Sequence, residues 1–443
     1  MPTAQTDIVI GKDVLELLSS AMYVDPLSIY REYVQNSADA IDQALGAGLY
    51  RQGTLPRIDI TLDPSTRRAV IRDNGVGVSR AQFTRTLSAI GASKKRGSAA
   101  RGFRGVGRLA GLGYCKELLM RSRSLGDNHV SEIRWDCIRL TELLRESCEQ
   151  TLQEIVREIT AVSQRPASDA DPAHFFEVEL CGVIRYRNDL LLNELAIQDY
   201  LSQVGPVPFH PEFTHAEEIQ RFLHQHAVAN SYSVTLNGAE VYRPYRDCFE
   251  LTPKLTDRFT SLETFCLPSI SEGLDAVGWV LHSNYHGAFP ERLGIKGLRV
   301  RAGNIQIGDS RLLDCVFPEE RFNAWTVGEC HITSRKLVPN GRRDAFEQNS
   351  HYANLVKNLM PYAKAITKHC REFSARRARE RKAAVGAAME SFDWPKAKLF
   401  LNENWKLSVP KATRNKLEKL LQTKGLKFSQ VVQILLGDSP SSK

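Results

Sequence analysis

Residues 31–42, REYVQNSADAID, place a carboxylate, an amide and further acids in what their spacing predicts to be one helix. Glu32, Asn36 and Asp39 lie at positions i, i+4 and i+7, which form one stripe of an α-helix. This arrangement suits a Mg²⁺–nucleotide site, because Mg²⁺ prefers hard oxygen ligands and a carboxylate can orient a water molecule. A solvated helix face has the same composition, so these residues alone leave both interpretations open.

The segment after this helix has the pattern of a β-hairpin that ends in an acid. Residues 57–62 and 68–72 alternate apolar and polar side chains around a DPST turn, and DNGVGV follows directly. Asp73, at the end of the second strand, can accept a hydrogen bond from an exocyclic amine such as that of adenine. Gly75 and Gly77 let the backbone approach a ligand closely because they lack Cβ. A plain Asn-Gly turn is the alternative.

A third stretch, residues 90–113, is rich in glycine, small residues and cationic side chains. Glycine-rich backbone followed by helical sequence offers N–H groups and a helix N-terminus to phosphate oxygens. The candidates are Gly102, Gly105 and Gly107. The Walker pattern is absent, and a dinucleotide-binding βαβ unit is disfavoured because a hairpin precedes the glycines.

In order and spacing, the three stretches resemble the ATP-binding domain of the GHKL superfamily, which includes DNA gyrase, the heat shock protein 90 (HtpG-like) chaperones, sensor histidine kinases and MutL. The resemblance implies an α/β sandwich of the Bergerat type. It also implies that Glu32 orients the attacking water, Asn36 binds Mg²⁺ and Asp73 reads adenine. The ligand-binding set that it implies is Asn36, Asp39, Asp73, Gly75, Gly77, Ser93, Lys94, Gly102, Gly105, Val106 and Gly107, in which the residues from Ser93 onward form the ATP lid.

Two features bear on how far the resemblance extends. Histidine kinases usually lack the helix glutamate, so the presence of Glu32 favours hydrolysis over phosphotransfer. The family also has a threonine that opens a late strand of the domain. The matching stretch here, AHFFEVEL at 173–180, has His174 or Phe175 at that position, so the adenine end of the site departs from the family pattern.

A second domain is expected to follow, with alternating strands and helices from about residue 230. SYSVTLNG predicts a strand with an Asn-Gly turn, and residues 297–309 predict a strand pair. Residues 337–366 predict a polar loop before a long amphipathic helix. This loop resembles the middle domain of the heat shock protein 90 chaperones, in which an arginine reaches the γ-phosphate. The matching residues are Asn340, Arg343, Asp344, Gln348 and Asn349. An exposed basic loop is the alternative, and Arg342 stands beside Arg343.

The length of 443 residues predicts two or three domains. We expect an ATP-binding domain at 1–210, with a helical insertion at 139–172, then a transducer or middle domain at 211–370, and a basic helix with a small helical region at 371–443. No apolar run has membrane-spanning length and no signal segment is visible, which predicts a cytoplasmic protein without a membrane partner. The nine cysteines form no CxxC pair and are expected to be reduced thiols.

We therefore predict an α/β ATPase domain, an α/β transducer-like middle domain and a small helical tail. The predicted activity is Mg²⁺-dependent hydrolysis of ATP to ADP and phosphate, with Glu32 and Arg343 as catalytic residues. Nucleotide binding would close the N-terminal and middle domains of a chaperone-like machine that acts on a protein client. A nucleotide-dependent homodimer is among the expected assemblies. The tail is too short for the chaperones' long dimerisation domain, so the resemblance does not extend to their constitutive dimer.

Two other functions stay open. One is a MutL- or MORC-like DNA-associated clamp, which the net charge of +8 and the basic helix at 371–385 would suit, although such charge runs are usually solvated. The other is a nucleotide-binding switch without turnover, which the missing threonine would allow.

Overall fold

A computed structural model describes residues 25–50, 54–90, 107–146, 150–228 and 230–390. The chain divides into two compact units, residues 1–368 and 369–443, and both sheets described below belong to the first unit. Several predictions fall outside the described residues: those for Ser93, Lys94, Gly102, Gly105 and Val106, and those for the tail after residue 390.

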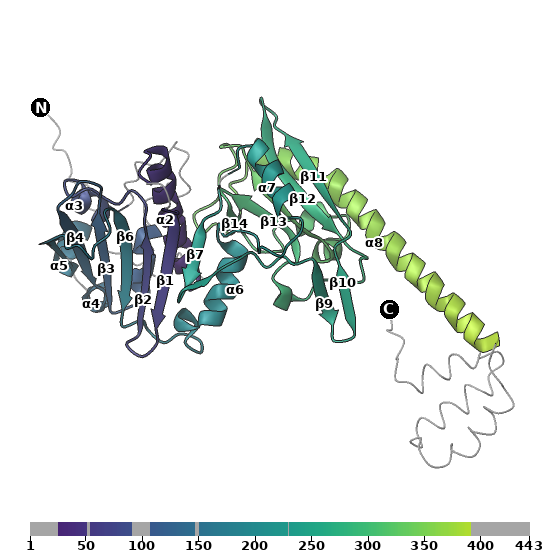
Figure 1. Ribbon diagram of the computed structural model, residues 1–443, viewed down its shortest axis with the longest axis horizontal. Helices are drawn as coiled ribbons and strands as arrows, with labels where there is room; N and C mark the ends of the chain where they lie inside the picture. Colours follow the sequence, from purple (N-terminus) through teal and green to yellow (C-terminus); the bar gives the residue numbers. More distant parts are fainter. Residues whose placement is uncertain (1–24, 51–53, 91–106, 147–149, 229, 391–443) are drawn as a thin grey trace, which may run out of the picture. The chain divides into compact units, whose positions relative to one another are not determined.

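The first domain is built on an eight-stranded sheet, with the strand order β5-β4-β3-β6-β2-β1-β7-β8 (Figure 1). Neighbouring strands are antiparallel except for β1 and β7, which are parallel. The predicted hairpin is confirmed, with Ile60 opposite Ile71. The strands are β1 Arg57–Asp63, β2 Arg68–Asp73, β3 Glu117–Arg123, β4 His129–Asp136, β5 Thr160–Pro166, β6 Phe175–Cys181, β7 Ser233–Leu236 and β8 Ala239–Glu240.

Helix α2, Ser28–Gly46, packs on one face of this sheet against β1 and β2. Its apolar residues recur at helical spacing, and Tyr30, Val34, Ala38 and Ile41 are fully buried. The side chains that alternate inward from β1 and β2 complete this core. The remaining helical segments of the domain are α3 Phe83–Leu87, η2 Gly107–Gly113, α4 Cys137–Arg145, α5 Leu152–Ile159, η3 Leu190–Leu192 and α6 Glu194–Val204.

The predicted helical insertion is confirmed only in part. Asp136 caps α4 by accepting a hydrogen bond from the Arg139 amide, and a capping box of Thr151 and Glu154 begins α5. From Thr160 the chain forms β5 instead, so the helical prediction is wrong for residues 160–166. Pairing with β4 decides this segment, because residues 160–166 form ladder hydrogen bonds with the neighbouring strand that a continued helix would not make.

Strands β7 and β8 belong to the first sheet although they follow residue 210. The predicted Asn-Gly turn joins them, and the Asn237 side chain accepts a hydrogen bond from the Leu62 amide of β1. The division at residue 210 stays a prediction, but the chain returns to the first sheet after that point.

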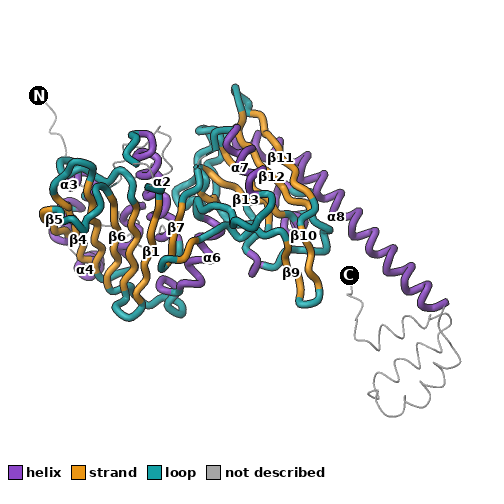
Figure 2. Tube along the Cα trace, viewed as in Figure 1, coloured by secondary structure: helices purple, strands orange, loops and turns teal. Residues whose placement is uncertain are grey.

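The second domain contains a five-stranded sheet, with the order β11-β12-β15-β13-β14, and a β9–β10 hairpin (Figure 2). The strand pair predicted at 297–309 is confirmed as β13 and β14. The expected alternation of strands and helices is wrong here, since between Ser233 and Ile332 the described chain has only short 3₁₀ turns between its strands. The elements are α7 Ala216–Gln225, β9 Cys248–Thr252, β10 Leu255–Arg258, β11 Ser261–Pro268, β12 Leu274–His282, η4 Glu291–Leu293, β13 Gly297–Ala302, β14 Ile305–Ile307, η5 Asp314–Val316, η6 Glu320–Trp325 and β15 Val327–Ile332.

Helix α8, Ser350–Glu390, confirms the long helix predicted after the polar loop. Asn349 caps it by accepting a hydrogen bond from the Tyr352 amide. Leu355, Leu359 and Ile366 form a buried stripe at helical spacing. Among the described helices, none combines the length and the apolar character that crossing a membrane requires.

Candidate functional site

The polar stripe of α2 is buried, which contradicts the alternative of a solvated helix face. Glu32 is 8% exposed and Asp39 is 3% exposed, while Asn36 is half-buried. Apolar residues of the same helix hold it against the sheet, so these polar side chains lie inside the protein. A buried carboxylate must have partners, because burying an unpaired charge is costly.

One partner of Glu32 is the end of the glycine-rich stretch. Gly107 opens η2, and a Cβ at this position would overlap the Oε2 atom of Glu32. Further along η2, the Gly111 amide donates a hydrogen bond of 2.9 Å to the Tyr33 hydroxyl. The backbone that follows the predicted lid therefore packs closely on the helix that carries Glu32.

Arg343 reaches Glu32 from the second domain. Its Nε atom lies 3.9 Å from Oε1 of Glu32, and its side chain is 9% exposed. The neighbouring Arg342 is exposed, so only Arg343 of the pair is buried at this carboxylate. Arg343 has a φ of 59°, a left-handed conformation that is strained for a residue with a side chain. The Asn340 and Asp344 side chains hydrogen-bond to each other across this turn.

Arg31 also belongs to this cluster, and the sequence did not single it out. Its Nη2 atom lies 3.3 Å from Oε1 of Glu32 and donates a 3.2 Å hydrogen bond to the carbonyl oxygen of Arg342. Arg31 thus joins the helix to the loop that carries Arg343. The only signal in the sequence was its position beside Glu32, and its contact with residue 342 depends on tertiary structure.

Asp73 lies at the other end of the polar stripe of α2. It is 2% exposed, and its Oδ1 atom accepts a 2.9 Å hydrogen bond from the Gly75 amide. A Cβ on Gly75 would lie 2.7 Å from Ala40 of α2, and a Cβ on Gly77 would overlap the carbonyl oxygen of Arg123. Both predicted glycines are therefore required for the chain to pass between α2 and the sheet.

His174 and Ser122 occupy the region in which the family threonine was expected. The His174 Nδ1 atom lies 2.7 Å from the carbonyl oxygen of Gly75. Ser122 and Asp73 both lie opposite Phe176 of β6, so they share one row of the sheet. The Ser122 hydroxyl accepts a 2.7 Å hydrogen bond from the Val78 amide. A buried hydroxyl therefore lies in the same row of the sheet as Asp73, but two strands away on β3, a strand that the sequence analysis did not point to.

The site thus consists of two clusters along α2. Glu32, Gly107, Arg343 and Arg31 form one, and Asp73 with its glycines forms the other, against Ala40. Eight residues of helix separate Glu32 from Ala40, which corresponds to roughly 12 Å.

Comparison with known proteins agrees with this geometry. Residues 28–164 match the family described as "Histidine kinase-, DNA gyrase B-, and HSP90-like ATPase". The match covers α2, the hairpin, Asp73 and the glycine-rich stretch, and it ends before the second domain. The first domain is therefore similar to GHKL ATPase domains.

Two curated relatives are bacterial chaperones. The chain is 27% identical to the chaperone protein HtpG of Polaromonas naphthalenivorans (strain CJ2) in an alignment of 139 residues that covers 28% of this chain and 22% of that protein. It is 30% identical to the chaperone protein HtpG of Coxiella burnetii (strain RSA 331 / Henzerling II) over 142 residues, with the same coverage of each chain. The matched region spans about a fifth of the length of these relatives.

Proposed function

We propose that the chain binds ATP and Mg²⁺ between α2, β2 and η2, and hydrolyses the ATP with Glu32 and Arg343. The observation that carries this proposal is the position of Arg343, which comes from the second domain and lies at the buried carboxylate of Glu32. A guanidinium at this place can neutralise charge that develops on a transferred phosphoryl group.

The residues present fit a nucleotide. Asp73 offers a buried acceptor for the adenine amine, and the close packing of Gly75 leaves its backbone near that acceptor. The phosphate end would lie near Glu32 and Arg343, so the ligand would follow α2 over the roughly 12 Å between the two clusters. The glycine-rich stretch before Gly107 would contribute phosphate-binding N–H groups.

Mg²⁺ would be held together with the phosphates rather than by the protein alone. In the part of the chain that the structure describes, no three His, Cys, Asp or Glu side chains form a metal-binding group. Asn36 offers one amide oxygen, and Mg²⁺ at ATP sites typically uses one or two protein oxygens, phosphates and water. When bound, the ion would neutralise phosphate charge during the reaction.

Within this site Glu32 would orient the attacking water and accept its proton, while Arg31 and Arg343 hold the carboxylate in place. Asp39, which is buried on the same stripe, would support the ligand-binding side of α2. The similarity to HtpG supports a chaperone-like machine, in which nucleotide binding changes the contact between the two domains and acts on a protein client. A nucleotide-dependent homodimer belongs to the same proposal.

A DNA-associated clamp is the alternative. Arg371, Arg376 and Arg379 are exposed on α8, where they could contact phosphates. Retention of DNA that weakens steeply with salt, together with ATPase stimulation by DNA, would favour the clamp. Stimulation by an unfolded protein, but not by DNA, would favour the chaperone-like machine.

The proposed site is tested by replacing the adenine-reading acid. Asp73→Asn keeps the size of the side chain but removes its charge and one acceptor. We expect it to weaken ATP binding about tenfold to a hundredfold, because a buried polar contact to the ligand becomes mismatched. Isothermal titration calorimetry with ATP and Mg²⁺ measures this effect.

The matched control is Asp59→Asn, because Asp59 lies on the outward face of β1 and pairs with Arg57. We expect this variant to bind ATP as the wild type does. Equal affinities for the wild type and Asp73→Asn would contradict the proposed adenine site.

A further inference from the structure

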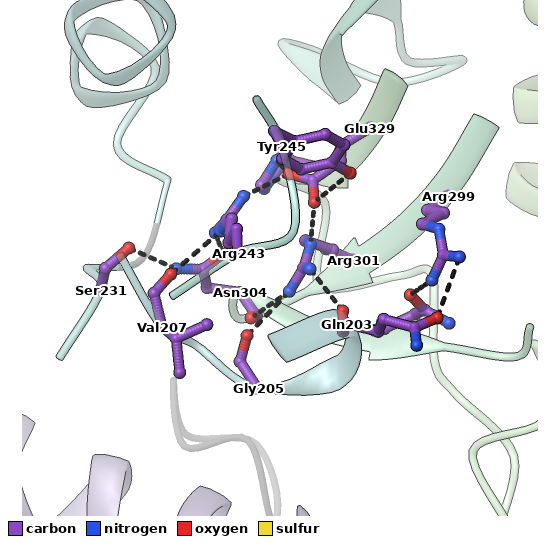
Figure 3. Close-up of polar contacts among 12 residues, drawn as sticks. Gln203, Gly205, Val207, Ser231, Arg243, Tyr245, Arg299, Arg301, Asn304 and Glu329 are labelled. Carbon is purple, nitrogen blue, oxygen red and sulfur yellow. Dashed lines mark hydrogen bonds and ion pairs between the residues drawn. The ribbon is translucent and has the colours of Figure 1, made fainter. Parts of the chain in front are cut away.

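A buried polar cluster lies where the two domains of the first unit are joined (Figure 3). Arg243, Arg299, Arg301 and Glu329 are each at most 3% exposed. Arg301 donates to Glu329 at 2.6 Å, and Arg243 also contacts this carboxylate. Two buried guanidinium groups thus share one carboxylate, and the third, that of Arg299, binds the Gln306 and Gln203 side chains.

The arginines hold the end of α6 and the chain that leaves it. Arg301 donates hydrogen bonds to the carbonyl oxygens of Gln203 and Gly205, at 2.6 and 3.0 Å, and Arg243 donates to that of Val207 at 3.0 Å. Positive charge is favourable at the C-terminal end of a helix, where carbonyl groups lack partners within the helix. The connection that leaves the first domain is therefore fixed to β13 and to the chain after β8.

A chain of hydrogen bonds leads from this junction to Arg343. Arg299 donates to the Gln203 side chain at 3.1 Å and to the Gln306 side chain at 2.9 Å. Gln306 in turn donates to the carbonyl oxygen of Gly308 at 3.0 Å. The Gly308 amide donates to the carbonyl oxygen of Arg343 at 2.8 Å. Each link is of ordinary hydrogen-bond length.

The other end of this chain lies beside the helix that carries Glu32. Helix α6 packs against α2. Burial raises the pKa of Tyr200 on α6, and Arg31 and Glu32 are close enough to act on this pKa as well. Helix α6 is thus in contact with α2, while Gln203 near the C-terminal end of α6 is bound to the hydrogen-bond chain that ends at Arg343.

Such a cluster is poorly explained by stability alone. Buried ion pairs are often no more stabilising than apolar residues of the same size, whereas fully satisfied polar networks fix one geometry. Gln306 uses both ends of its amide, one toward Arg299 and one toward Gly308. A side chain with one acceptor and one donor is required to continue the chain in this way.

We propose that Arg299 and Gln306 are positioning residues, which set the place of Arg343 relative to Glu32 by tying its loop to the end of α6. This inference rests on the proposed function, since it assigns the two residues an effect on ATP hydrolysis. They act through the Arg343 backbone and touch no substrate. A shift of α6 against α2 would be passed through Gln203 and Gln306 to the arginine loop.

The central experiment is a double-mutant cycle of Gln306→Ala and Arg343→Ala in the full chain. We expect Gln306→Ala to keep its affinity for ATP and to lower kcat about tenfold to a hundredfold, as a misplacement of about 1 Å does. The double variant should hydrolyse ATP at the rate of Arg343→Ala alone, because residues that act as a unit are not additive. If the kcat losses of the two single variants multiplied in the double variant, the proposal would be overturned.

Val300→Ala is the control for a general loss of packing. Val300 is fully buried on β13 between Arg299 and Arg301, but its side chain takes no part in the hydrogen-bond chain. We expect Val300→Ala to lower the melting temperature while its kcat stays near that of the wild type. Equal losses of kcat in Val300→Ala and Gln306→Ala would show that Gln306 has a merely structural role.

A measurement that needs no turnover separates this inference from the proposed function. Hydrogen exchange of the Gly308 amide reports its bond to Arg343 directly. We expect exchange to accelerate in Gln306→Ala and to remain slow in Val300→Ala. Unchanged exchange in Gln306→Ala overturns the positioning role. If Arg343→Ala were fully active, the proposed catalytic function would fail, while the exchange result would still decide whether Gln306 holds the loop.

Discussion

At the scale of the residue, Gly77 shows how tightly the segment after Asp73 is held. Its φ is 67°, and a Cβ there would overlap the carbonyl oxygen of Arg123. Gly126 has a φ of 87°, but a Cβ there would meet nothing within 4 Å. The two glycines share a backbone conformation and differ in the space around them.

We therefore expect Gly77→Ala to lower the free energy of unfolding by about 3 kcal/mol or more, because it adds a steric clash to the backbone strain. Gly126→Ala should cost about 1 kcal/mol, from backbone strain alone. Urea denaturation of both variants measures the difference. Similar losses would mean that the close approach at Arg123 contributes little.

Single residues were predictable where a motif carries its own chemistry. Glu32 lies on the expected helix, and Asp73 lies at the expected strand end. Gly75 and Gly77 follow Asp73 at positions where the backbone is closely packed. Arg31 and Ser122 were not predictable, because their roles depend on partners far away in the chain. Arg299 and Arg301 alternate with apolar residues along the predicted strand, a pattern that normally places charged side chains in solvent. Both are nevertheless buried, because carbonyl groups at the end of α6 and other polar side chains satisfy them.

At the scale of the element, strand β15 carries a fully buried carboxylate, Glu329, into the middle of the second sheet. Burial alone would raise the pKa of Glu329, but Arg243 and Arg301 outweigh burial and hold this pKa well below its usual value. The charged form therefore stabilises the fold above the unfolded pKa of about 4.3, and this contribution is lost as the pH falls through the folded pKa.

We expect Glu329→Gln to lower the free energy of unfolding at pH 7 by about 3–5 kcal/mol, because two buried guanidinium groups lose their counter-charge. Glu263→Gln is the matched control, since Glu263 lies on β11 of the same sheet and pairs with His282 of β12, but its side chain is 47% exposed. It should change the free energy of unfolding by less than about 1 kcal/mol. Chemical denaturation at pH 7 compares the two, and equal effects would contradict the importance of the buried cluster.

Elements were predicted well where the local pattern was strong and less well where pairing decides. The hairpin of β1 and β2 and the long helix α8 follow from alternation, turn residues and helical spacing. Strand β5 was taken for a helix because its identity depends on β4, and the second domain is richer in strands than its pattern indicated.

At the scale of the whole molecule, the chain crosses twice between its two sheets. It leaves the first domain after α6 and returns to it as β7, and the two crossings meet where the Tyr232 amide donates a 2.9 Å hydrogen bond to the carbonyl oxygen of Pro206. Asn304 of the second domain also binds the returning segment at Asn230 and Ser231. A nucleotide-dependent change between the domains would therefore act on the Arg343 loop as well as on these crossings.

In the proposed function, Glu32 is the group that activates water for hydrolysis of bound ATP. The most direct test of this role is ATP turnover by the full chain with saturating Mg²⁺ and ATP, for the wild type beside Glu32→Ala, with ATP affinity measured on both. We expect Glu32→Ala to bind ATP and to hydrolyse it at least about a hundredfold more slowly, as is typical when a general base is lost. A variant that binds ATP with unchanged affinity and hydrolyses it at the wild-type rate would contradict the account.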